Sequence, residues 1–69
     1  MDKAEIAKLQ AYFRMKFNNP AIEVRARPRK EDSCEVYIGE EFMGVLYIDD
    51  EDDDRSFMFQ MAILDVDLD

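Results

Sequence analysis

Residues 34–48, CEVYIGEEFMGVLYI, contain the pattern that decides the fold. Residues 34–38 alternate apolar and polar side chains, which is typical of a strand with one buried face. Residues 39–41 predict a short hairpin connection, because the glycine that opens it can adopt a positive φ. Residues 42–48 are apolar on both faces, which predicts a central strand. The whole stretch therefore predicts an antiparallel hairpin.

One further strand is predicted before this hairpin and one after it. Residues 22–27 alternate apolar and charged side chains until Pro28, and the charged residues 29–33 predict a loop. Residues 57–64 are again apolar on both faces and predict the last strand. The alternation of this strand changes face near Ile63, which predicts a bulge or the edge of the sheet there.

A helix is predicted at about residues 3–17. Asp2 and Glu5 have the spacing of a capping box, with Asp in place of Ser or Thr. Asn19 and Pro20 end the helix, because proline cannot continue it. Its apolar face repeats at steps of three and four residues and consists of Ile6, Leu9, Phe13 and Phe17.

These elements predict an α+β fold in one domain, residues 1–69: one N-terminal helix packed on a four-stranded antiparallel meander (α-β-β-β-β). One helix covers one face of the sheet, and an apolar face left open is typical of an interface. The sequence leaves open which of two residue sets faces the helix. One set is Phe42, Leu46, Phe57, Phe59 and Met61. The other set, the candidate interface, is Tyr37, Met43, Val45, Tyr47, Met58 and Leu64.

The charge is divided between two halves of the chain. Residues 1–30 carry eight cations and three acids (8 − 3 = +5), and residues 31–69 carry one cation and fourteen acids (1 − 14 = −13), which sum to −8. This net charge repels a polyanion, so we predict no direct nucleic-acid binding. We expect the basic side chains to face acids of the same chain or of a second copy. The candidate anion contacts are Arg25, Arg27, Arg29 and Lys30.

The cysteine and histidine content excludes several kinds of site. Cys34 is the single cysteine and histidine is absent, so neither a disulfide within the chain nor a Cys–His nucleophile pair can form. We therefore predict a non-enzymatic protein without a cofactor. The longest apolar run, residues 42–48, is far below the about 20 residues that cross a membrane, and the N-terminus lacks a signal-peptide pattern. These features predict a cytoplasmic protein with no membrane contact.

The acidic residues 49–54 are compared with a calcium-binding EF-hand loop. With Asp50 in the first position, Arg55 replaces the required glycine and Met61 replaces the required glutamate. We predict a solvated loop without specific calcium binding, and a weak divalent-ion site stays open as an alternative.

Four segments of the chain resemble a small uncharacterised family of alphaproteobacterial proteins, catalogued as a domain of unknown function. They are residues 26–30, 35–39, 44–47 and 59–65. The resemblance implies a short cytoplasmic bacterial protein and brings no activity, ligand or site. The α-β-β-β order is also similar to double-stranded-RNA-binding domains, but the basic helix that closes such domains is replaced here by acidic sequence.

The predicted function is a non-enzymatic protein–protein interaction module. It self-associates through the open apolar face of its sheet as a homodimer, and a further protein partner is unknown. Two alternatives remain from the sequence. One is an acidic decoy or regulator that binds the basic site of a nucleic-acid-binding protein, and the other is a weak divalent-ion binding domain.

Overall fold

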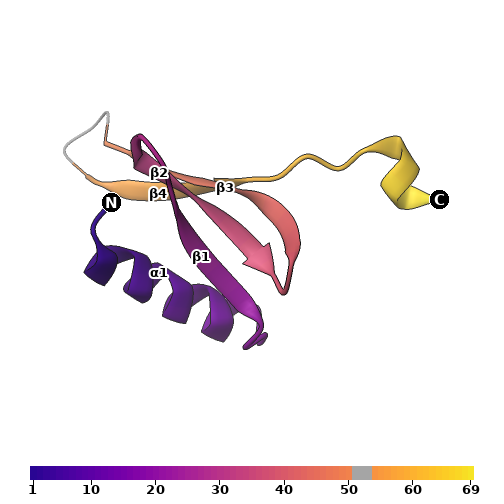
Figure 1. Ribbon diagram of the computed structural model, residues 1–69, viewed down its shortest axis with the longest axis horizontal. Helices are drawn as coiled ribbons and strands as arrows, with labels where there is room; N and C mark the ends of the chain where they lie inside the picture. The colour runs from indigo at the N-terminus through magenta and orange to yellow at the C-terminus, as the bar shows by residue number, and fades with distance from the viewer. Residues whose placement is uncertain (51–53) are drawn as a thin grey trace.

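The structure is a computed structural model that describes residues 1–50 and 54–69, and its elements follow the predicted α-β-β-β-β order (Figure 1). The elements are α1 (Lys3–Lys16), β1 (Ile22–Arg27), β2 (Lys30–Ile38), β3 (Glu41–Asp49), β4 (Ser56–Gln60) and the 3-10 turn η1 (Asp65–Leu68). The strands form one antiparallel sheet in the order β1-β2-β3-β4. The predicted fold class is therefore confirmed. The centre of the predicted acidic loop, residues 51–53, lies outside the described residues.

The residues that flank α1 determine where the helix begins and ends. The carboxylate of Asp2 accepts a hydrogen bond from the backbone N–H of Glu5, at 2.8 Å. At the other end Asn18 adopts a positive φ of 51°, which asparagine tolerates. Arg14 and Lys16 lie in the last turn, where cations stabilise the helix dipole.

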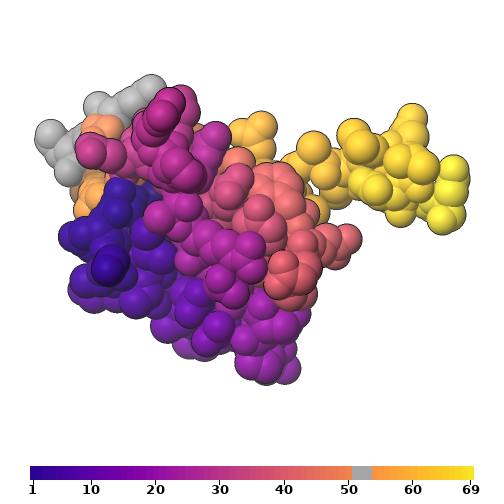
Figure 2. Space-filling view, viewed as in Figure 1, coloured from indigo at the N-terminus to yellow at the C-terminus, as the bar shows by residue number. Residues whose placement is uncertain are grey.

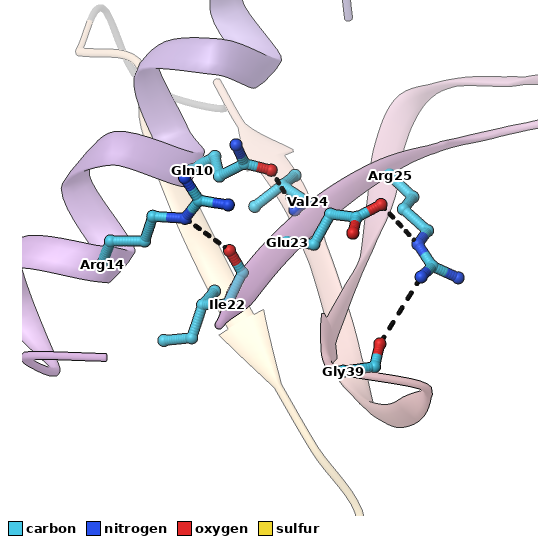
Figure 3. A network of polar contacts seen from close by, with 7 residues as sticks. All are labelled: Gln10, Arg14, Ile22, Glu23, Val24, Arg25 and Gly39. Carbon is cyan, nitrogen blue, oxygen red and sulfur yellow. Dashed lines mark hydrogen bonds and ion pairs between the residues drawn. The ribbon is translucent and has the colours of Figure 1, made fainter. Parts of the chain in front are cut away.

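Side chains of α1 also cover the outer edge of β1 (Figure 3). Gln10 accepts a hydrogen bond from the backbone N–H of Val24 at 3.0 Å, and Arg14 Nε donates to the carbonyl of Ile22 at 2.7 Å. Free backbone groups on an edge strand invite pairing with another chain, and these two contacts block that pairing at β1. They also hold α1 along β1, which is the strand that it contacts most.

The predicted loop at residues 29–33 is wrong, because β2 already begins at Lys30. The turn between β1 and β2 is short, with Arg29 at a positive φ of 64°. A register shift between Ala26 and Arg27 accompanies it. Residues 30–32 are charged and exposed, although they lie at the start of a strand. A charged, exposed segment is also typical of a loop, which is why the sequence predicts one here.

The core lies between α1 and the sheet. Its buried side chains are Phe13, Ile22, Val24, Cys34, Val36 and Leu46. Phe57 and Phe59 pack against this core from β4, so the set that contains Leu46 is the one that faces the helix. The opposite face of the sheet is named here the open face, and no helix of the described residues lies on it (Figure 1).

A β-bulge at Met43 exchanges two of the expected positions. Val36 pairs with Gly44 and Tyr37 pairs with Phe42, so Met43 has no partner across β2. The extra residue turns Phe42 to the face of Tyr37, with the two ring centroids 5.7 Å apart, and Met43 packs against the core. The expectation that Met43 lies on the open face is corrected accordingly. Strict alternation cannot reveal an inserted residue.

The last strand is shorter than predicted. It ends at Gln60, which pairs with Val45, and residues 61–69 leave the sheet as a C-terminal tail that projects from the body (Figure 1). A bulge bends its strand, and the pairing of β3 with β4 runs only from Val45 with Gln60 to Asp49 with Ser56. Leu64 therefore lies in the tail, 59% exposed, and not on the open face as expected.

Candidate protein interface

The open face presents a strip of apolar side chains, named here the apolar strip. It consists of Tyr37, Phe42, Val45, Tyr47 and Met58. Two cross-strand pairs build its ends, Tyr37 with Phe42 and Tyr47 with Met58. Phe42 is 50% exposed and Met58 46% exposed, while Val45 is half-buried between the pairs. Four of the six predicted interface residues are thus brought together, and Phe42 is the member that the sequence missed.

Arg25 borders the apolar strip and is engaged within the chain (Figure 3). Its guanidinium carbon lies 3.9 Å from the centroid of the Tyr37 ring, which is a cation–π contact. Its Nε donates to Glu23 Oε1 at 2.8 Å, and this hydrogen bond raises the pKa of Arg25. Arg25 therefore extends the flat surface beside Tyr37, and its charge is matched by a neighbouring carboxylate.

The other predicted anion contacts do not join Arg25 in one cluster. Arg27 Nη1 donates to the hydroxyl of Ser33 at 3.0 Å. Arg29 forms the turn after β1, and Lys30 begins β2 as an exposed residue. The expectation that these cations face acids of the same chain is met by Arg25 and Glu23, whereas Arg27 contacts a neutral hydroxyl.

A second apolar surface lies on the helix side of the sheet and is named here the helix groove. It exists because α1 lies along β1 and leaves the helix side of β4 partly uncovered. The groove has a volume of about 480 Å³, and Glu5 and Lys8 stand among its polar lining residues. Its apolar lining is Leu9, Tyr12, Phe13, Leu46, Phe57 and Phe59. The sequence predicts the apolar residues of this groove but not the lateral position of the helix, so it misses the groove itself.

Cys34 has a structural position. Its side chain is fully buried, and its Sγ lies 3.8 Å from the sulfur of Met1. Burial raises the pKa of this thiol, because the interior disfavours a thiolate. A buried thiol of this kind behaves as a small apolar residue.

The raised pKa of Cys34 predicts a pH dependence of stability. The folded state keeps the thiol proton more tightly than the unfolded chain, so stability is full below the unfolded pKa of about 8.5. It falls as the pH rises through the higher folded value. Urea unfolding followed by circular dichroism should therefore show that, above this pH, the unfolding free energy of the wild type falls more steeply than that of Cys34→Ala. Parallel curves for the two proteins would contradict the assignment.

The described part of the chain gives no ligand set for a metal. Within residues 1–50 and 54–69, no group of three or more cysteine, aspartate or glutamate side chains is placed to hold an ion. The prediction about residues 49–54 falls largely on residues outside this range. No helix of the described residues is long and apolar enough to cross a membrane.

The sequence matches the model of a family described as "Protein of unknown function (DUF3126)" over residues 5–67, so the chain belongs to this family. No curated protein and no solved structure shows significant similarity to the chain. The expected membership in a domain of unknown function is confirmed, and the family description assigns no activity to the apolar strip or to the helix groove.

Proposed function

We propose that this member of the family is a non-enzymatic interaction module that forms a homodimer through its open face. The observation that carries the proposal is the apolar strip, in which Phe42, Tyr47 and Met58 remain between 37% and 50% exposed. Aromatic residues and methionine are enriched in the cores of protein interfaces, and methionine adapts its shape to a partner. The bacterial and cytoplasmic setting that the sequence resemblance implies belongs to the same proposal.

A second copy is the partner that suits this surface. The apolar strip itself contains no charged side chain. Glu35 pairs with Val45 from β2 and has Arg25 opposite it on β1, so the acid beside the strip lies next to a cation when two strips meet across a twofold axis. Arg25 beside the strip is bound by Glu23, and Arg27 donates to Ser33, the cross-strand partner of Tyr47. A chain of 69 residues also has a small core, and association with a second subunit is a common way to stabilise such a domain.

The experiment compares two substitutions that add the same charge. Tyr47→Asp places a carboxylate within the apolar strip, where the dimer would remove it from water. We expect sedimentation equilibrium to show a dimer dissociation constant raised about a hundredfold or more. Ala7→Asp adds the same charge on the exposed side of α1 and should leave the dissociation constant within about threefold of the wild type.

Equal dissociation constants for Tyr47→Asp and Ala7→Asp would contradict the open face as the interface. Circular dichroism of both variants provides the control for folding. Tyr47 is 37% exposed, so its substitution leaves the buried core in place.

A further inference from the structure

The C-terminal tail is the second unpartnered apolar part of the described chain. Its large side chains are highly exposed: Ile63 63%, Leu64 59%, Val66 70% and Leu68 74%. The undocked tail forms one local turn, in which the Asp67 carboxylate accepts from the backbone N–H of Leu64 at 3.0 Å and the backbone N–H of Asp67 donates to the Leu64 carbonyl at 2.9 Å. Four apolar side chains in one short segment are a costly exposure unless another surface covers them.

The charges of the tail and of α1 are complementary. The tail carries Asp65, Asp67 and Asp69 and no cation, which gives −3. Residues 3–16 carry four cations and one acid, which gives 4 − 1 = +3. The one acid, Glu5, is bound by Arg55 at 2.8 Å, so the margin of the helix groove keeps a positive character at Lys8.

We propose that the tail of one copy docks in the helix groove of a second copy in the homodimer. The inference rests on the proposed self-association and names a second contact within it. The groove supplies an apolar floor for the side chains of Leu64, Val66 and Leu68, and Lys8 pairs with the aspartates between them. The donor is a second copy because the tail points away from the body of its own chain (Figures 1 and 2).

The tail is long enough for this exchange. On docking, the turn η1 opens, and the nine residues then span up to about 30 Å. The two shorter dimensions of the molecule are 24 Å each. A tail can therefore pass the edge of a partner that is joined through the open face and reach its helix side. Because the open faces already hold the two copies together, docking of the tail is favoured by a high effective concentration.

A cross-linking experiment on the full chain tests the exchange directly. Unlabelled and ¹⁵N-labelled proteins are mixed, equilibrated and treated with a carbodiimide, which joins a carboxylate to an amine in contact with it. We expect cross-links between Lys8 and Asp65 or Asp67, and about half of them should join a light chain to a heavy chain, as random pairing of two equal populations requires. Lys8→Arg keeps the charge and should remove these cross-links.

Substitution in the tail gives the matching energetic measurement. Val66→Asp should raise the dimer dissociation constant about tenfold, roughly the effect of losing one buried aliphatic side chain. Val66→Leu stays apolar and should leave the dissociation constant unchanged.

The outcomes separate the two proposals. A dimer without Lys8 cross-links, or with cross-links only within one isotopic form, overturns tail exchange and leaves the open-face dimer standing. A monomer at every concentration overturns the self-association on which the exchange depends.

Discussion

Phe13→Ala is expected to remove most of the stability of the domain. Phe13 is 8% exposed and links α1 to β4, because its ring stacks on Phe17 at the end of α1 and meets the edge of Phe59, with both centroids 5.6 Å away. Truncation of a buried phenylalanine costs about 3–5 kcal/mol. Small domains have total stabilities near the lower end of about 5–15 kcal/mol, so the variant should be largely unfolded at room temperature. Urea unfolding followed by far-UV circular dichroism measures the loss.

Met15→Ala is the control for this substitution. Met15 lies on the same helix and is 68% exposed. Its truncation should cost less than about 1 kcal/mol, because little buried surface is lost. Similar losses in the two variants would show that Phe13 does not centre the core.

Gly44→Ala is expected to separate β4 from β3. A Cβ at Gly44 would lie 2.4 Å from the backbone oxygen of Gln60 and 2.9 Å from the ring of Phe59. The first contact involves backbone, so the end of β4 must move. Overpacking of this kind costs about 1–3 kcal/mol and sometimes more. Amide hydrogen exchange should accelerate at residues 56–60 and stay slow in β1 and β2.

Gly39→Ala is the comparison for Gly44→Ala. A Cβ at Gly39 meets no atom within 4 Å, but the positive φ of 61° strains an alanine. We expect a loss of about 1–2 kcal/mol from this backbone strain, with no selective exchange in β4. Selective opening of β4 in Gly39→Ala, or its absence in Gly44→Ala, would contradict the role given to Gly44.

The sequence predicts the parts of the fold that depend on local chemistry. Asp2 marks the start of α1, Pro20 follows its end, and alternation identifies β1. The start of β2 is missed, since strongly charged residues can also occupy the exposed end of a strand. The bulge at Met43 is missed because nothing in an apolar run marks which residue lacks a partner.

The candidate site is predicted as far as alternation holds. Four residues occupy the open face as expected: Tyr37, Val45, Tyr47 and Met58. Val45 and Tyr47 both follow the bulge in β3, so the alternation between these two residues is unbroken. The helix groove depends on where α1 lies across the sheet. That position is fixed by side-chain hydrogen bonds of Gln10 and Arg14 to the edge of β1, which periodicity cannot reveal.

The solution mass of the wild-type chain tests the central claim most directly. One chain has a mass of 8.2 kDa, so the proposed homodimer has 2 × 8.2 = 16.4 kDa. Light scattering after gel filtration, repeated from low micromolar to near-millimolar loading, should give the dimer mass over most of this range, with dissociation only at the lowest loading. A mass of 8.2 kDa at every loading would contradict self-association through the open face.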